Sequence, residues 1–194
     1  MIYIKDNFLD QKLFDLLQDD VKNFEKVDTP GKSFWVHLAE KNLIKYISSK
    51  LGIIEGCVVE NVLAFFREAK EGQDNDWRIH NDTIINDQQP DRAIVLYLSP
   101  IKKKALNGTA FWEHKEYGDV YPKGKSTEEF NRMLKQDAND VSKWDLRSII
   151  SHKENRLISY PCKYFHSKYP NEFEESRIVL VMFYKTKKYE RKND

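Results

Sequence analysis

The chain has 194 residues, which suits a single domain, and its 40% of hydrophobic residues excludes an intrinsically disordered protein. Its 32 basic and 31 acidic residues leave a net charge of +1, which argues against binding of nucleic acid through bulk charge. No apolar run approaches the roughly 20 residues of a membrane span, and the first residues lack the pattern of a signal peptide. We therefore expect a soluble, cytoplasmic protein whose Cys57 and Cys162 are buried, reduced side chains.

Residues 1–56 are predicted to form mainly helices that support the remainder of the chain. Residues 2–4 favour a short strand, and Asp10 suits the N-cap of the helix that follows. A second amphipathic helix precedes Gly52, a residue type that commonly ends helices. The residues that recur at helical spacing are Leu13, Leu16, Leu17, Val21 and Phe24 in the first helix and Leu43, Ile44, Ile47 and Leu51 in the second.

Short β-rich runs separated by polar turns follow, from residue 57 to residue 185. Each run has the length and the content of branched and aromatic residues that strands of a sandwich or barrel have. Helices followed by strands predict an α+β fold built on a jelly roll. The predicted strands are residues 58–69, 92–99, 109–112, 156–161 and 177–185.

A long polar segment, about 113–155, interrupts the strands. Ser126 and Glu129 have the spacing of a capping box that opens a helix. Insertions of this length within a compact domain are usually lids or binding loops, so we predict a helical insertion that closes over a substrate. A second apolar face in this segment is suggested by Trp144, Ile149 and Ile150.

An H-x-D pair, His80 and Asp82, is the strongest chemical signal in the sequence. Two residues apart on an extended segment, both side chains point to the same side and can bind one metal ion. His166, shortly after the predicted strand 156–161, is the candidate third ligand. Two imidazoles and one carboxylate leave the opposite face of a metal open, as in non-haem iron(II) oxygenases. Because an H-x-D pair also arises by chance, the alternative is a polar turn whose histidine caps a strand end.

Arg177 begins the last predicted strand, eleven residues after His166. A buried guanidinium there can bind one carboxylate of a keto acid through two hydrogen bonds while the other end of the acid chelates the metal. The sequence thus offers a metal site together with an anchor for a dicarboxylic cosubstrate.

The order of these motifs resembles the prolyl 4-hydroxylase-like branch of the 2-oxoglutarate oxygenases. The matching segments, between Trp77 and Tyr184, are the H-x-D, IVLYLSP, NGTAFW, RLISYPCKYFHSKYP and SRIVLVMFY. The resemblance implies one oxygenase domain, residues 1–194, with a double-stranded β-helix core at 57–185 behind N-terminal helices.

The resemblance also implies the cofactors: iron(II) at the triad of His80, Asp82 and His166, 2-oxoglutarate at Arg177, dioxygen as the oxidant, and ascorbate as an optional addition. The chain departs from the family pattern after Arg177, where the Arg-x-Ser variant of the cosubstrate anchor is absent. The second hydrogen bond to 2-oxoglutarate is therefore open, and Tyr97 is the candidate for it.

The other histidines compete less well for a metal. An H-x-E pair, His114 and Glu116, is separated from His166 by only one clear strand, whereas a jelly roll needs ligands near an early and a late strand. We therefore expect His114 and Glu116 to be solvated. His37 and His152 have no partner at ligand spacing and are expected at ordinary polar positions.

Two further residues allow two interpretations each. Arg67, on the predicted strand 58–69, either faces the cavity or, as is commoner for such residues, forms an ion pair at the strand edge. Trp112 either lines the pocket or is an aromatic residue of the core.

These observations predict a dioxygenase that hydroxylates a C–H bond of a peptidyl or free amino acid or of a small metabolite. Neither a membrane nor a nucleic acid is expected as a partner, and the oligomeric state is open. The alternative is a non-catalytic, cupin-like metal-binding β-barrel, which would hold zinc in a closed shell of four ligands and have no affinity for 2-oxoglutarate.

Overall fold

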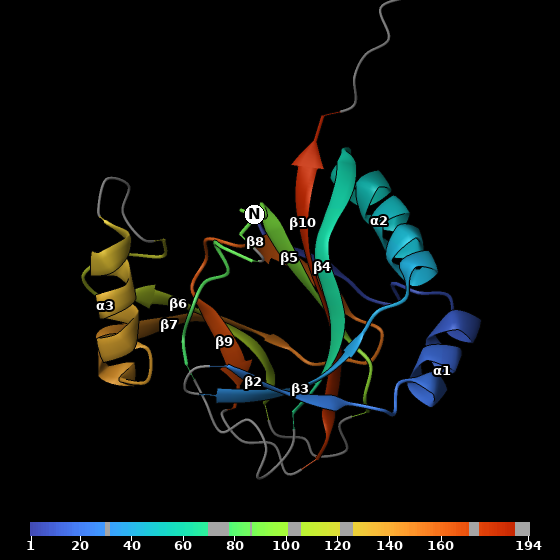
Figure 1. Ribbon diagram of the computed structural model, residues 1–194, viewed down its shortest axis with the longest axis horizontal. Helices are drawn as coiled ribbons and strands as arrows, with labels where there is room; N and C mark the ends of the chain where they lie inside the picture. The colour runs from blue at the N-terminus through green and yellow to red at the C-terminus, as the bar shows by residue number, and fades with distance from the viewer. Residues whose placement is uncertain are drawn as a thin grey trace, which may run out of the picture.

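Two antiparallel sheets form the centre of the protein in the computed structural model, which describes residues 1–29, 32–69, 78–85, 87–100, 106–120, 126–170 and 175–188. The larger sheet has the strand order β1-β8-β5-β10-β4-β3-β2 and the smaller one β7-β6-β9 (Figure 1). The strands are β1 (Tyr3–Lys5), β2 (Glu25–Thr29), β3 (Lys32–Leu38), β4 (Val58–Ala69), β5 (Arg92–Tyr97), β6 (Gly108–His114), β7 (Trp144–Ser151), β8 (Leu157–Pro161), β9 (His166–Tyr169) and β10 (Arg177–Lys187). The predicted α+β jelly roll is confirmed.

The central strands β5 and β10 are buried on both faces. On β5, Val95 and Tyr97 point between the two sheets, where Phe111 of β6 packs against them. Alternate residues such as Leu96 and Met182 point to the opposite face of the larger sheet. Because side chains of a strand alternate between faces, burial on both sides explains why these two runs are apolar without alternation.

Helices α1 (Gln11–Asp20) and α2 (Lys41–Glu55) cover the outer face of the larger sheet (Figure 1). The Asp10 side chain accepts a hydrogen bond from the amide of Leu13, so the predicted N-cap is confirmed. The prediction that Gly52 ends the second helix is wrong. That residue is buried inside α2, and Gly56 ends the helix with a left-handed φ of 66°. A glycine inside a helix costs only about 1 kcal/mol, which packing against a sheet outweighs.

The first 56 residues are less helical than predicted. Strands β2 and β3 form a hairpin that extends the larger sheet, with Trp35 opposite Glu68 of β4. Strand β2, EKVDT, has a single apolar residue and so lacks the pattern from which a strand is predicted, whereas β3, KSFWVHL, has the aromatic and branched residues of a strand and was overlooked.

The predicted insertion is shorter than residues 113–155. Its helix, α3 (Thr127–Asp137), has the expected capping box between Ser126 and Glu129. Residues 144–151, however, form strand β7, which pairs with β6 along its length. Trp144 and Ile150 pack on opposite faces of the smaller sheet. Their spacing therefore shows no regular periodicity in the sequence, and this strand could not be told from part of a lid.

Helix α3 packs on the outer face of the smaller sheet, away from the space between the sheets (Figure 1). Met133 lies in one buried cluster with Trp112, Trp144 and Phe165. Of the two interpretations of Trp112, the core aromatic is confirmed: the side chain is 6% exposed, and its indole N–H donates to the Ser167 hydroxyl at 2.9 Å.

Two expectations from composition can be compared with the structure. In the part of the chain that the structure describes, no helix has the length and apolar content to span a membrane. Cys162 is buried as expected, whereas Cys57 is only half-buried, and both are free thiols.

Replacing Gly108 by alanine is expected to destabilise the fold by at least about 2 kcal/mol. A Cβ at this position would lie 2.0 Å from the carbonyl oxygen of Ile150, and the φ of 152° disfavours any side chain. Urea unfolding measures the effect. The control Gly118→Ala also has a positive φ, 82°, but an open surrounding, so it should cost only about 1 kcal/mol. Equal losses in the two variants would contradict the steric argument.

Candidate metal centre

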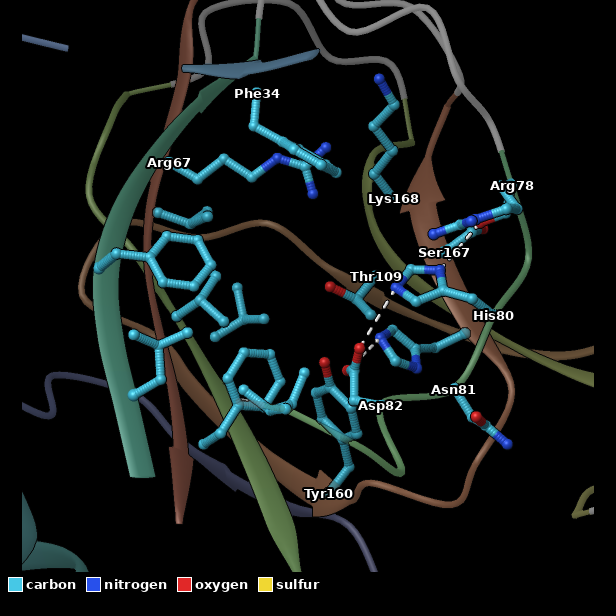
Figure 2. Close-up of a pocket in the computed structure, with 18 of the residues that line it drawn as sticks. Phe34, Arg67, Arg78, His80, Asn81, Asp82, Thr109, Tyr160, Ser167 and Lys168 are labelled. Atoms are coloured by element: carbon cyan, nitrogen blue, oxygen red, sulfur yellow. Dashed lines mark hydrogen bonds and ion pairs between the residues drawn. The ribbon is translucent and has the colours of Figure 1, made fainter. Parts of the chain in front are cut away.

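The two histidines and the aspartate predicted as metal ligands lie together. One ligand atom from each of His80, Asp82 and His166 lies within 4.8 Å of the others. The carboxylate of Asp82 is 3.5 Å from Nε2 of His80 and 3.1 Å from Nε2 of His166 (Figure 2). Among the described residues this is the single cluster with the spacing of a metal site.

Backbone hydrogen bonds hold the three ligands in place. The amide of His80 donates to the carbonyl of His166 at 3.0 Å, and the amide of His166 donates back at 2.8 Å. The amide of Asp82 donates to the carbonyl of Cys162 at 2.9 Å. The segment with the H-x-D pair therefore lies antiparallel beside the start of β9, although it forms only an isolated bridge and no long strand.

The orientation of both imidazoles suits a metal. Nδ1 of His80 lies 3.0 Å from the carbonyl oxygen of Arg78, and Nδ1 of His166 lies 3.0 Å from that of Tyr164. Because a carbonyl can only accept, each Nδ1 carries a proton, which leaves Nε2 of each ring, the atom on the side of Asp82, as the nitrogen that can bind a metal. Hydrogen bonds of this kind orient metal-binding histidines in proteins generally.

The electrostatics of the cluster also fit a cation. Burial lowers the pKa of His166, but the adjacent Asp82 carboxylate more than offsets this, so that the pKa is raised overall. The site thus favours a positive charge beside Asp82. Two neutral nitrogen donors and one carboxylate match the preferences of divalent transition metals, and three ligands leave coordination positions open.

A cavity of about 490 Å³ opens beside the three ligands. Most of its apolar wall comes from the larger sheet, with Ile84 and Ile85 from the segment after Asp82, and its polar groups come from several segments (Figure 2). The apolar lining comprises Phe34, Leu63, Phe65, Ile84, Ile85, Val95, Val179, Val181 and Phe183.

Arg177 lines this cavity and is 6% exposed. Burial lowers the pKa of its guanidinium, although arginine stays charged in proteins. The guanidinium carbon lies 5.4 Å from the centre of the Tyr97 ring, and Nη2 donates to the carbonyl of Gly108 at 3.4 Å. A charged group is therefore held in the same cavity as the metal ligands.

Tyr97 is fully buried behind the cavity wall and is not among its lining residues. Its hydroxyl shares a hydrogen bond of 2.8 Å with the hydroxyl of Thr109, which does line the cavity. Burial raises the pKa of the Tyr97 phenol, so the hydroxyl keeps its proton. Tyr97 thus contacts two groups of the cavity lining, the Arg177 guanidinium and the Thr109 hydroxyl.

Sequence reasoning missed Thr109 and Tyr160. Tyr160 lines the cavity, its ring centre lies 4.7 Å from that of His166, and Figure 2 shows its hydroxyl pointing toward Asp82. Burial, reinforced by the charge of Asp82, raises the pKa of this phenol well above its usual value. Alternation along the strands could have found both residues, since Thr109 is two positions from Phe111 and Tyr160 is two from Ile158, which face the same interior.

The prediction that His114 is solvated is wrong. The side chain is 2% exposed, its Nε2 lies 3.1 Å from the Asp137 carboxylate, and its Nδ1 accepts from the amide of Glu116 at 3.1 Å. A carboxylate of α3 satisfies Nε2 and the turn after β6 satisfies Nδ1, which explains how a polar ring is buried there. Glu116 is exposed, as expected.

The remaining histidines lie apart from the cluster. His37 is half-buried, and its Nδ1 lies 3.1 Å from the carbonyl of Asn23. His152 packs on the ring of Tyr97 with its Nε2 2.7 Å from the carbonyl of Ser99. Burial and the nearby Arg177 lower the pKa of His152 to about 4, so it is neutral at pH 7.

The predicted lid does not border the cavity. None of the described residues between 113 and 155 lines it, because α3 packs its apolar face on the far side of the smaller sheet. Phe34 of the unpredicted hairpin lines the cavity instead. Arg67 also lines it, with its guanidinium 4.8 Å from the Phe34 ring centre, so of its two interpretations the cavity-facing one is confirmed.

Comparison with solved structures identifies the fold as that of 2-oxoglutarate oxygenases. A prolyl-4-hydroxylase from Pseudomonas putida is similar with a TM-score of 0.54 at 12% identity, over 95% of this chain and 91% of that one. SnoK, a non-haem alpha ketoglutarate dependent carbocyclase from nogalamycin biosynthesis, is similar with a TM-score of 0.64 at 9% identity, over 96% of this chain and 79% of that one. HygX from Streptomyces hygroscopicus, with nickel and 2-oxoglutarate bound, is similar with a TM-score of 0.58 at 10% identity, over 95% of this chain and 82% of that one.

No protein-family model and no curated protein matches the sequence. The likeness to the solved structures therefore concerns the fold, a double-stranded β-helix, as the sequence predicted.

Replacing His166 by alanine is expected to weaken binding of manganese(II) at least about 100-fold, because it removes one of three ligand atoms. Loss of a residue that only hydrogen-bonds to a metal ligand already weakens metal binding by about 10- to 100-fold. Isothermal titration calorimetry measures the affinity. His37→Ala, which removes an imidazole outside the cluster, is the control and should leave the affinity unchanged. Unchanged manganese affinity in His166→Ala would place the metal site elsewhere.

Proposed function

We propose that this protein is an iron(II)- and 2-oxoglutarate-dependent dioxygenase that hydroxylates a C–H bond of a small molecule. The observation that carries the proposal is the placement of the buried Arg177 in the same cavity as His80, Asp82 and His166. Three ligands on one face of a metal ion occur in several classes of metal protein. A buried guanidinium in the same cavity is what a cosubstrate with two carboxylates requires.

In this proposal His80, Asp82 and His166 hold iron(II), and the open positions take the keto acid end of 2-oxoglutarate. Arg177 binds the distal carboxylate, and the hydroxyl of Thr109 donates the second hydrogen bond. Tyr97 supports this anchor through its contacts with both groups. Because these side chains are already packed, little ordering is needed when the cosubstrate binds.

When bound, iron(II) with 2-oxoglutarate and dioxygen supplies the oxidising chemistry, in which the keto acid yields succinate and carbon dioxide and one oxygen atom enters the substrate. The protein contributes geometry and a dry cavity. The apolar wall formed by residues such as Val179 and Phe183 excludes water from the reacting centre. Tyr160, kept neutral by burial, can donate a hydrogen bond beside Asp82.

The competing hypothesis is a cupin-like module that binds a metal for structure alone. Such sites have a closed shell of four ligands. The described residues supply three ligands beside a cavity of about 490 Å³, which favours the enzyme. Because residues of both sheets, from β3 near the start of the chain to β10 near its end, line this one cavity, we also propose that residues 1–194 act as a single oxygenase domain.

Arg177→Gln is expected to weaken 2-oxoglutarate about 10- to 100-fold, since hydrogen bonds to a charged group contribute about 1.5–3 kcal/mol. Calorimetry on the manganese-loaded protein measures binding, and succinate release with iron(II) and dioxygen measures KM for 2-oxoglutarate. Arg147→Gln, on the exposed side of β7, is the control and should bind normally. If the metal-loaded protein has no affinity for 2-oxoglutarate, the cupin-like module is the better interpretation.

A further inference from the structure

The cavity beside the three metal ligands has two unlike sides. Strand β4 lies across the cavity from these ligands (Figure 2). On β4 and its neighbour β10, four side chains that line the cavity are purely hydrocarbon. They are Leu63 and Phe65 on β4, and Val181 and Phe183 on β10.

These four residues form one continuous surface, which we call the apolar patch. In the pairing of β4 with β10, Val181 lies opposite Phe65, and Phe183 lies opposite Leu63. Residues two apart on a strand face the same way and lie about 7 Å apart, whereas neighbouring strands lie about 5 Å apart. The apolar patch therefore measures roughly 7 by 5 Å, which matches a six-membered ring or a short alkyl chain.

The apolar patch is less completely packed than the core beside it. Ala93 and Ile158, which belong to the same cluster between the sheets, are 0% exposed. Leu63, Phe65 and Val181 pack against that cluster but are only half-buried. Because all three line the cavity, the area that they leave exposed is available to a molecule bound inside it.

A cosubstrate held at Arg177 covers only part of this wall. Val181 and Phe183 follow Arg177 on β10 by four and six residues. At about 3.3 Å per residue, they lie about 13 and 20 Å further along the strand. A five-carbon keto acid is shorter than this, so the apolar patch extends past it and can contact a second molecule.

We propose that the substrate carries an uncharged apolar group, a ring or a short alkyl chain, which packs on the apolar patch and turns a C–H bond toward the metal ligands. Burial of hydrocarbon drives such binding, whereas a charged group against this wall would lose its hydrogen bonds with water. The cavity of about 490 Å³ lies within the range of about 300–1,000 Å³ that holds drug-sized ligands. This inference rests on the proposed function, because it takes the metal and 2-oxoglutarate to occupy the other side of the cavity.

The test uses the full chain loaded with manganese(II) and saturating 2-oxoglutarate. Calorimetry measures the affinities of neutral amides of increasing length: acetamide, butanamide and hexanamide. A fully buried CH₂ group strengthens binding about 4-fold, so we expect hexanamide to bind at least about 10-fold more tightly than acetamide. Equal affinities along the series would overturn the proposal.

Variants then assign the gain to the apolar patch. Phe65→Ala removes a ring and should reduce the preference for hexanamide over acetamide at least about 3-fold. Its matched control, Phe24→Ala, truncates a half-buried ring in the cluster on the opposite face of the larger sheet and should keep the preference. Val181→Thr adds a hydroxyl to a side chain of the same shape, so it should also reduce the preference, and it serves as the second variant if Phe65→Ala does not fold.

The two proposals fail in different ways. A preference for hexanamide that survives both Phe65→Ala and Val181→Thr would place the apolar contact elsewhere and overturn the inference alone. Both variants keep the metal ligands and Arg177, so the proposed function would stand. Absence of 2-oxoglutarate binding to the unchanged, metal-loaded protein would instead refute the proposed function.

Discussion

The reciprocal backbone hydrogen bonds between His80 and His166 are the constraint on which the site depends. They join two segments that are far apart in the sequence, and the bonds from each Nδ1 to a carbonyl of its own segment then direct both imidazoles toward Asp82. The His80 segment belongs to no long strand, so it lacks the cooperative support of a sheet ladder. Each hydrogen bond contributes only about 1 kcal/mol, and the position of the H-x-D pair therefore relies on a few local contacts, including that of Asp82 with Cys162.

The burial of Arg177 shows how the fold supports a charge in an apolar interior. Removing a guanidinium from water is costly, and its pKa is lowered for that reason. The Tyr97 ring and the carbonyl of Gly108 offset part of this cost. The close approach of Gly108 to Ile150, which no side chain would permit, brings that carbonyl within reach. The need for glycine at position 108 thus belongs to the same arrangement that holds Arg177.

Local patterns explain which parts of the site the sequence predicts. The spacing of His80 and Asp82 places both on one side of an extended segment, and the order of strands places His166 and Arg177 near them. Thr109 and Tyr160 share a face with Phe111 and Ile158 by alternation along their strands, but the sequence alone does not say that this face borders the metal ligands.

The errors in the fold prediction have the same origin. Strand β7 places Trp144 under α3 and Ile150 between the sheets, so neither helical nor strand periodicity is clear. Strand β2 is the partly exposed edge of the larger sheet, and its sequence EKVDT carries almost none of the apolar residues from which strands are predicted. In both cases tertiary position determines the structure and local preference does not.

The wrong prediction of a lid bears on which residues select a substrate under the proposed function. Helix α3 has its apolar face against Trp112, Trp144 and Phe165, so it cannot also present that face to a substrate. The cavity wall next to the triad instead includes Phe34 and Arg67, from β3 and β4. The metal ligands come from other segments, those around His80 and His166. Under the proposed function, substitutions at Phe34 of β3 and Arg67 of β4 change which molecule is accepted and leave the proposed metal ligands and Arg177 in place, which is how one fold serves different chemistry.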